Sequence, residues 1–483
     1  MGKKVIKNGC IVTPSDRYYA DIYIDGDKIK SIGQDLHIPE AEIINADGLY
    51  VLPGAVDEHT HMSMPNGGTL SMPWETETVA AAVGGTTTIV DFAIQEKGSS
   101  LEDTIHKWRA RATGNTAIDY SLHIAITDLT DEIIREIPLA VEQGVATFKL
   151  FMAYKEDKMV DDSTLFQVLK KAKEVGGLVM VHAENGDVIS LLQDQLIEEG
   201  KVQPLYHAVS RPIEIEAEAT RRAIALAKVA EAPIFIVHVS GEESAEEIRR
   251  ARSKGQPVYG ETCPHYLFLD ESYYDLPNFE GAKYVCSPPL REKFQQEKLW
   301  SAISDGTIQT IGTDHCSFNY KEQKHLGLND FRKIPNGGNG IENWIQLLYS
   351  YGVSTGKISL NKLVELTSSN PAKLMGLYPK KGSISIGSDA DIVLFDPEIE
   401  QQITAAKQKQ GSDYNFYEGF KIKGSPRHVL LRGEVIVENG SYIGCHSQGE
   451  FVKAQPYGAA YDMLSQKRGN KGENQSNKVT GAL

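Results

Sequence analysis

The sequence predicts an α/β protein that combines a (β/α)8 barrel, the TIM-barrel architecture, with a small composite β-sandwich formed by its N- and C-terminal segments. Three observations lead to this prediction. Eight nearly continuous apolar runs alternate with helical patterns in the middle of the chain. Short strand-like runs broken by Gly and Asp occupy both ends, and 483 residues exceed one ordinary core.

The first fifty residues alternate turns with short strand-like runs and show no helical period. Dipeptides such as Asp25-Gly26 between alternating runs are hairpin signals. We expect residues 1–52 to form the N-terminal part of the sandwich. The expected strands include Asp21–Ile24, Lys28–Ile32 and Glu42–Ile44.

The barrel is expected over residues 53–372. Its strand runs are almost wholly apolar, as in parallel sheets that are covered on both faces. They are Ala55–Asp57, Thr86–Phe92, Tyr120–Thr127, Thr147–Ala153, Leu178–Glu184, Ile234–Ser240, Val258–Cys263 and Ile308–Asp314. Helical patterns, several followed by the glycine that commonly ends a helix, lie at Asp131–Gln143, Ser163–Val175, Ile213–Ala230 and Glu243–Ser253.

Strand patterns return after the barrel, over residues 373–455. We expect Gly382–Pro397 and His428–Val437 to pair with the N-terminal strands in one sandwich. Residues 456–483 are expected to form a C-terminal tail, and its last part, Ser465–Leu483, is polar enough to be mobile.

Composition excludes several classes of partner. The chain has 50 Lys and Arg against 65 Asp and Glu, a net charge of −15, which argues against nucleic acid or an anionic membrane. No run approaches the roughly 18 apolar residues of a spanning helix, and no signal peptide is recognisable. The five cysteines are dispersed without a CxxC spacing, which is typical of reduced thiols, so we expect a cytoplasmic protein.

Five side chains that commonly bind metals follow or end the expected strands, where barrel enzymes place their catalytic groups. His59 and His61 are two residues apart, so on an extended strand they face the same side. Together they predict a metal-dependent hydrolase site made of His59, His61, His182, His238 and Asp314. The remaining His106, His123, His207 and His446 are expected to be ordinary hydrogen-bonded or surface residues.

Lys149 lies inside a strand run, where an ammonium group is costly to bury. Addition of CO2 to the amine would give a carbamate, an anionic ligand able to bridge two cations. The alternative is a packed lysine whose head reaches solvent or a carboxylate, and the residues alone leave both open.

Several motifs resemble one known family. Val51–His61 (VLPGAVDEHTH) and Gly382–Pro397 resemble the amidohydrolase superfamily. Four further stretches resemble its cyclic-imide branch, the dihydropyrimidinases or D-hydantoinases. They are Phe148–Tyr154 (FKLFMAY), Val181–Asn185 (VHAEN), Gly260–Tyr266 (GETCPHY) and Gly312–His315 (GTDH). The motifs occur together and in order, and the resemblance covers the chain from about Lys4 to Pro456.

This resemblance implies two divalent metal ions per subunit, most suitably Zn²⁺, with Mn²⁺ or Co²⁺ as alternatives. His59, His61 and Asp314 would bind one ion, His182 and His238 the other, and a carboxylated Lys149 would bridge them. The implied reaction is hydrolysis of a C–N bond in a cyclic amide by a hydroxide that bridges the metals. Dihydropyrimidines and 5-substituted hydantoins would be opened to N-carbamoyl amino acids, and the choice between a pyrimidine-catabolic substrate and another hydantoin stays open.

The resemblance also implies roles around the metals. Asp314 would orient the hydroxide and carry a proton, Tyr154 would stabilise the oxyanion, and Ser287 and Asn336 would hold the imide through backbone groups. Asp57 would orient a ligand from behind. Ring substituents would meet Met62, Met64, Phe151, Met152 and Met159, for which ordinary loop packing is the alternative.

Three related functions compete with this one. Dihydroorotases carry an arginine two residues after the His-x-His pair, where this chain has Ser63. Allantoinase fits Gly260–Tyr266 less well. The collapsin-response-mediator proteins keep the fold without the metal ligands, all six of which are present here. The expected partners are therefore a small cyclic amide and, from the family, further copies of the chain in a homotetramer, with no nucleic acid and no membrane.

Overall fold

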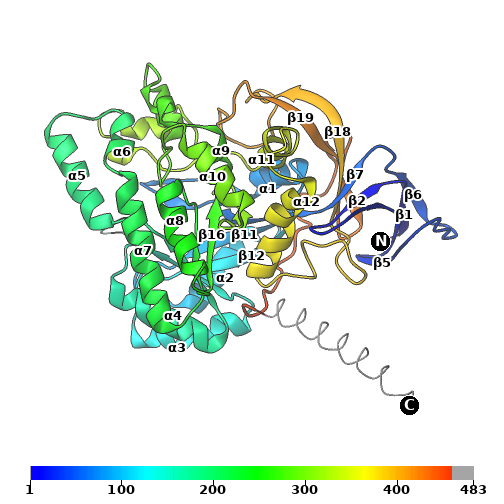
Figure 1. The fold of residues 1–483 in the computed structure, drawn as a ribbon, viewed down its shortest axis with the longest axis horizontal. Coiled ribbons are helices and arrows are strands. Elements are labelled where there is room, and N and C mark those ends of the chain that lie inside the picture. Colours follow the sequence, from blue (N-terminus) through cyan, green and yellow to red (C-terminus); the bar gives the residue numbers. More distant parts are fainter. Residues whose placement is uncertain (1, 156, 459–483) are drawn as a thin grey trace, which may run out of the picture.

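The computed structural model describes residues 2–155 and 157–458. Helices and parallel strands fill the middle of the chain, and strands dominate its two ends. In Figure 1 the helical part occupies one side of the molecule, and strands from both ends of the chain lie together on the other. The mobile tail predicted for Ser465–Leu483 lies outside the described residues and stays a prediction.

Eight parallel strands form the barrel, and each pairs with its neighbours in chain order. They are β8 (Ala55–Thr60), β11 (Thr86–Ile94), β12 (Asp119–Ala125), β13 (Thr147–Phe151), β14 (Leu178–His182), β15 (Ile234–Ile236), β16 (Val258–Thr262) and β17 (Thr310–Ile311). Beyond the last strand, Thr60 pairs with His315, and the amide of His61 donates to the His315 carbonyl at 2.8 Å. The seam of the barrel is thus joined at the C-terminal ends of its strands, and the predicted fold is confirmed.

Helices follow the strands and cover the outside of the barrel. They are α1 (Trp74–Val83), α2 (Leu101–Ala112), α3 (Asp131–Glu142), α4 (Asp162–Val175), α5 (Gly186–Glu198), α6 (Leu205–Val209), α7 (Ile213–Ala230), α8 (Glu242–Arg252), α9 (Pro264–Phe268) and α10 (Gln295–Ser304). Side-chain caps fix several starts: Asp161 accepts from the Thr164 amide and Asn185 from the Val188 amide. Helix α4 ends at Gly176, whose left-handed backbone (φ 73°) suits glycine.

Shorter elements fill the connections. A small hairpin, β9 (Pro65–Asn66) and β10 (Thr69–Leu70), lies between β8 and α1. The single turns are η1 (Glu271–Asp275), η2 (Glu280–Tyr284), η3 (Lys324–Gly327) and η4 (Phe331–Lys333). After them come α11 (Trp344–Leu348), η5 (Tyr349–Val353), α12 (Leu360–Val364), η6 (Glu365–Ser369) and α13 (Asn370–Leu374), of which η5 and η6 are π-helical.

Two sheets form the predicted composite sandwich. The first holds β1 (Lys3–Lys7), β4 (Asp21–Asp25), β5 (Lys28–Gly33) and β6 (Glu42–Asn45). The second holds β2 (Cys10–Val12), β3 (Arg17–Tyr19), β7 (Tyr50–Pro53), β18 (Ile392–Gln402), β19 (Lys421–Leu431), β20 (Glu434–Glu438) and β21 (Ser441–Tyr442). Strand β7 pairs with β18, and Ile22, Val51 and Ile392 share one core, so both chain ends build the sandwich. The predicted run Gly382–Pro397 becomes strand only at Ile392, because a turn with buried Asp389 and Asp391 precedes it.

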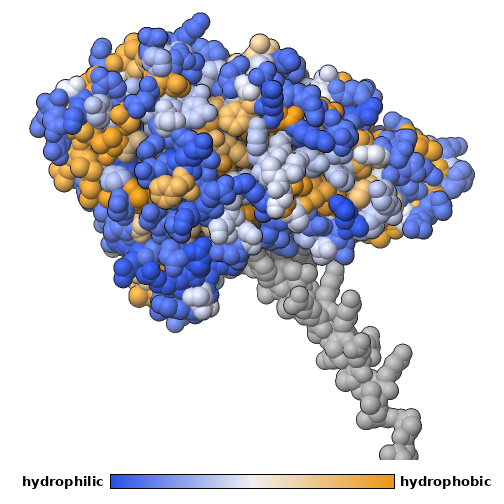
Figure 2. All heavy atoms as spheres, turned by 45° about the horizontal axis from the view of Figure 1, so that its top comes forward, coloured by the Kyte–Doolittle hydropathy of each residue, from blue (hydrophilic) through white to orange (hydrophobic). Residues whose placement is uncertain are grey.

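The two ends of the barrel differ in character. At the starts of the strands, Val56, Ala146 and Leu178 pack with Leu374 and Val452 in an apolar cluster. That cluster closes this end, so the polar groups at the other end are left to form a site. Outside, the face in Figure 2 is mainly hydrophilic with smaller apolar patches. No helix among the described residues is both long and apolar enough to cross a membrane.

A buried ion cluster joins the barrel to the sandwich. The Lys381 ammonium lies 2.7 Å from Asp391 and 2.9 Å from Asp389, and it also pairs with Asp119 at the start of β12. Arg432 pairs with the same Asp119, and its amide donates to Asp391 at 2.8 Å. Although burial favours the neutral amine, the three carboxylates raise the pKa of Lys381. The cluster is therefore stable only while its positive charges are present.

Replacing this cation should destabilise the fold. We expect Lys381→Met to lower the free energy of unfolding by about 3–5 kcal/mol, because three buried carboxylates lose their shared partner. Urea unfolding followed by fluorescence measures it. Lys357→Met, which removes an exposed pair with Glu297, is the control and should cost less than about 1 kcal/mol. Equal losses in the two variants would contradict the role given to the cluster.

Candidate metal centre

The six predicted ligands meet at the C-terminal end of the barrel. They line one cavity of about 150 Å³. They come from five strands or the residues just after them: His59 and His61 from β8, Lys149 from β13, His182 from β14, His238 after β15 and Asp314 after β17. The structure thus brings together residues that are up to 255 positions apart in the chain, as the parallel topology requires.

His59, His61 and Asp314 form one compact group. The Nε2 atoms of His59 and His61 lie 3.1 Å and 3.0 Å from the same Asp314 oxygen, Oδ1. Ligand atoms of all three lie within 4.8 Å of one another, which suits a single ion. Both histidines pack against the ring of Phe92, with centroids 4.7 Å and 4.9 Å away, and their Nε2 atoms lie beside Asp314.

His182 and His238 form a second group on the neighbouring wall. The Nδ1 atom of His182 lies 2.9 Å from Nε2 of His238, and the ring centroids are 4.6 Å apart. The two walls are adjacent, since the rings of His59 and His238 are 5.5 Å apart. Two neighbouring subsites therefore exist, each with two imidazole nitrogens.

Two buried glutamates behind the histidines were not singled out from the sequence. Glu261 Oε1 lies 2.7 Å from Nδ1 of His59, and Glu184 Oε2 lies 2.7 Å from Nε2 of His182. Each carboxylate favours a proton on the nitrogen it faces, which leaves the other nitrogen's lone pair for the cavity. Both glutamates lie inside the motifs GETCPHY and VHAEN. Glu184 follows His182 by two residues, which was an available signal, whereas the partner of Glu261 is distant in the sequence.

The charges at the centre favour a cation. Burial opposes a proton on His59, but Glu261 and Asp314 raise its pKa to about 9. Burial raises the pKa of Asp314, but His59 and His61 outweigh this effect and hold it well below its usual range. An imidazole lone pair and a carboxylate oxygen that face each other repel unless a positive charge lies between them. Imidazole and carboxylate donors in this arrangement fit Zn²⁺, Mn²⁺ or Co²⁺.

Lys149 is only 1% exposed and lies between the two histidine groups on the wall of the cavity. Its Nζ atom is 5.0 Å from the centroid of Phe92 and 5.3 Å from that of Phe151. Burial lowers the pKa of Lys149 to about 8, which increases the fraction of neutral amine. The neutral amine is the form that adds CO2, so the surroundings of Lys149 fit carbamate formation.

Three site residues have a left-handed backbone. Tyr154, His238 and Asp314 have φ values of 65°, 41° and 49°, a region that non-glycine residues adopt rarely and at a cost of about 1–3 kcal/mol each. The amides of Asp157, Lys158 and Met159 all donate to the Tyr154 carbonyl, at 3.0–3.1 Å. The amide of His238 donates to Glu261 at 3.0 Å. These bonds hold strained residues whose side chains turn into the cavity.

The residues expected to bind the imide lie across the same cavity. Tyr154, Ser287 and Asn336 all line it. The Ser287 hydroxyl lies 3.3 Å from Nε2 of His207, a buried hydrogen-bonded histidine as expected, which also contacts the Cys286 carbonyl at 2.9 Å. Gly337 follows Asn336 with φ 132°, and a β-carbon there would collide with the Cys316 carbonyl. A side chain at this position is therefore excluded, and the backbone next to Asn336 can be approached closely.

The expected contacts to ring substituents divide into two groups. Met64 and Phe151 line the cavity, together with Asn66, Lys158 and Arg332. Met62, Met152 and Met159 do not line it. Met62 and Met152 are at most 2% exposed and belong to the main core, because each follows a cavity residue and points the opposite way. Met159 lies close to Gly186, where its sulfur would meet an added β-carbon.

Asp57 supports the backbone behind the ligands. Its Oδ1 atom accepts from the amides of His59 at 3.3 Å and Thr313 at 3.0 Å, and Oδ2 accepts from the Thr313 hydroxyl at 2.5 Å. It therefore holds the segment before Asp314 against the first strand and touches no ligand ring. The contact across the barrel seam was not visible in the sequence.

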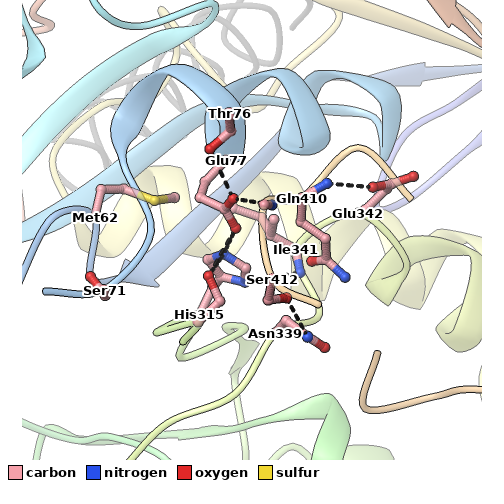
Figure 3. A network of polar contacts seen from close by, with 12 residues as sticks. Met62, Ser71, Thr76, Glu77, His315, Asn339, Ile341, Glu342, Gln410 and Ser412 are labelled. Carbon is pink, nitrogen blue, oxygen red and sulfur yellow. Dashed lines mark hydrogen bonds and ion pairs between the residues drawn. The ribbon is translucent and has the colours of Figure 1, made fainter. Parts of the chain in front are cut away.

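His315, next to Asp314, is held by a second polar network. Figure 3 shows Glu77 of α1 pointing towards His315, and the two side chains are 2.5 Å apart. Glu77 also accepts from Ser317 at 2.9 Å and from the Gly411 amide at 2.6 Å. The other ring nitrogen of His315 accepts from the Gly340 amide at 3.3 Å. The network links the loop after Asn336 and the segment near Gly411 to the barrel seam.

Comparisons with known proteins agree with this geometry. Residues 50–436 match the amidohydrolase family model. The D-hydantoinase of Geobacillus stearothermophilus is 51% identical over 458 residues, covering 94% of this chain and 97% of that protein. The D-hydantoinase of Ralstonia pickettii is 49% identical, covering 94% and 99% of the two chains. The crystal structure of the dihydropyrimidinase from Brevibacillus agri is 50% identical with a TM-score of 0.94, covering 94% and 99%.

These relatives confirm the resemblance found in the motifs, from VLPGAVDEHTH to GTDH. The family model matches most of the chain, and the matched residues include all six predicted ligands, which line the cavity. This chain belongs to the amidohydrolase family.

Proposed function

We propose that this protein hydrolyses the ring C–N bond of cyclic imides and ureides, namely 5,6-dihydropyrimidines and 5-substituted hydantoins, to N-carbamoyl amino acids. The observation that carries the proposal is the meeting of all six candidate ligands in one cavity, in a chain about half identical to hydantoinases. In the reaction a C–O bond forms at the ring carbonyl, the ring C–N bond breaks, and the departing nitrogen gains a proton.

Two divalent ions, most suitably Zn²⁺, would be held by His59, His61 and Asp314 on one side and by His182 and His238 on the other. A carbamate on Lys149, formed from its amine and CO2 with release of a proton, would serve both. When bound, such ions polarise a carbonyl and lower the pKa of water towards neutrality. Ligand geometry supports this assignment, since the two groups of nitrogens lie on adjacent walls of the cavity.

Asp314 is placed to move the proton. Its carboxylate faces the cavity, and its side chain is 13% exposed, the most open of the carboxylates at the centre. Because neighbouring histidines keep it ionised, it is able to accept a proton from water and to return it to the ring nitrogen. Asp57 accepts from the amide of Thr313 and so fixes the backbone just before Asp314.

Tyr154 and the backbone beside Ser287 and Asn336 would hold the substrate. Burial raises the pKa of Tyr154, so its hydroxyl stays protonated and is able to donate to an oxyanion. The imide C(O)–NH–C(O) unit would meet backbone donors and acceptors near Ser287 and Asn336. Met64 and Phe151 leave an apolar wall for the ring substituent. A homotetramer, predicted from the family, and a cytoplasmic location, predicted from the sequence, stay predictions that light scattering and fractionation would check.

The direct test is the initial rate of ring opening with dihydrouracil and with hydantoin, followed as the loss of ring-amide absorbance. We expect turnover by metal-replete protein, its loss after chelation, and its return with Zn²⁺, Mn²⁺ or Co²⁺. If the protein binds two ions per subunit but opens neither ring, the proposal is wrong.

Lys149→Ala should lose metal as well as activity, because the bridging carbamate disappears. We expect fewer than two ions per subunit by elemental analysis, with Lys170→Ala on the exposed face of α4 as the control. Wild-type apoprotein in CO2-free buffer should regain activity with metal only after bicarbonate is added. Full metal occupancy in Lys149→Ala would show that the lysine binds no ion.

Tyr154→Phe should lower kcat by about 10²- to 10³-fold, the usual effect of removing one oxyanion donor. Metal content should not change, because the tyrosine is not among the ligands. Tyr19→Phe, on the exposed edge strand β3, is the matched control. A kcat within threefold of wild type, measured with dihydrouracil, would assign Tyr154 to packing alone.

A further inference from the structure

Lys324 is a completely buried lysine next to the active-site cavity, at the start of η3. Its Nζ atom donates to three backbone carbonyls, those of Val285 at 3.1 Å, Pro335 at 2.6 Å and Gly337 at 2.7 Å. The ammonium has three donors, so all of them are used. Among the described residues it forms no ion pair with a carboxylate, and the ring of Phe318 lies 5.6 Å away.

The three carbonyls belong to the two loops that carry Ser287 and Asn336. We call residues 285–288 and 335–338 the imide cradle. The loops touch directly, since the Gly337 amide donates to the Val285 carbonyl at 2.9 Å. The Val285 oxygen therefore accepts from Gly337 and Lys324 together, and Lys324 adds two contacts on the other loop. One side chain therefore contacts both loops and supplements their direct contact.

Burying the ammonium group of Lys324 costs free energy, because the group loses its hydration. Burial lowers the pKa of Lys324 to about 7, since no carboxylate offsets the lost hydration. Three carbonyl dipoles compensate in part, but a methionine of similar length would fill the space without a charge. Removing the lysine would leave three carbonyls with fewer donors at the edge of the cavity.

We propose that Lys324 is a positioning residue for catalysis, which fixes the two loops of the imide cradle at the separation that fits the C(O)–NH–C(O) unit of the substrate. It acts through the backbone of residues 285–288 and 335–338 and does not touch the substrate. The inference rests on the proposed function, because only a ligand held by both loops needs their spacing to be fixed. Apart from the direct bond between the Gly337 amide and the Val285 carbonyl, two further supports hold one loop each: His207 contacts the Cys286 carbonyl, and the Cys316 amide donates to the Gly338 carbonyl.

The test compares Lys324→Met and Lys324→Gln with wild-type holoenzyme, using initial rates with dihydrouracil. The cradle binds the imide in both the ground state and the transition state, so its loss should act mainly on KM. We expect KM to rise about tenfold or more in Lys324→Met, with kcat within about threefold and two metal ions per subunit retained. Lys324→Gln keeps two N–H donors on a shorter side chain and should give an intermediate KM.

Lys321→Met, an exposed lysine three residues earlier, is the matched control and should leave KM unchanged. If Lys324→Met fails to fold, the KM of Lys324→Gln decides alone. Unchanged KM in a folded Lys324 variant, or a kcat loss that follows metal loss, would overturn the positioning role. Wild-type protein that opens no ring would instead overturn the proposed function, and the assignment of the cradle with it.

Discussion

Closure of the parallel barrel at the ends of its strands is the constraint on which the rest of the site depends. The contact between Thr60 and His315 joins the first strand to the segment after the last one. His61 and Asp314, which lie next to these two residues, are thereby brought within 3.0 Å of each other. Asp57 and Glu77 reinforce the seam from either side, through Thr313 and His315. The arrangement of His59, His61 and Asp314, the first group of candidate ligands, is therefore a property of the barrel seam.

The charged groups around the cavity determine which kind of ligand it binds. Glu184 and Glu261 are buried behind the histidines, and Arg211 contacts Glu184 at 2.6 Å. Although burial opposes ionisation, Arg211 and His182 hold the pKa of Glu184 at about 2. Asp314 lies directly against His59 and His61, so a cation bound between these side chains would meet a carboxylate oxygen as well as imidazole nitrogens. The left-handed backbone conformations of His238 and Asp314 are strained. The hydrogen bonds of these two residues, and an ion bound to them, would offset that strain.

The sequence predicted the barrel and the sandwich because both depend on local periodicity. The eight strand runs all overlap observed strands, and helix Ile213–Ala230 has the predicted bounds. The His59 and His61 pair was predictable because its spacing fixes a common face. Glu261, His207 and Lys324 could not be assigned in the same way, since their partners are 202, 79 and up to 39 residues distant. Met62 and Met152 were predicted to contact ring substituents because they lie next to ligands in the sequence. Side chains alternate along a strand, so both point into the core instead.

Three buried lysines show how surroundings decide the use of one residue type. Lys381 faces three carboxylates, which raise its pKa and keep it a structural cation. Lys324 donates to three backbone carbonyls, so its nitrogen serves to hold two loops together. Lys149 faces histidines and aromatic rings, and burial lowers its pKa to about 8. Of the three, only Lys149 lines the cavity, and its lowered pKa increases the fraction of neutral amine, the form that adds CO2.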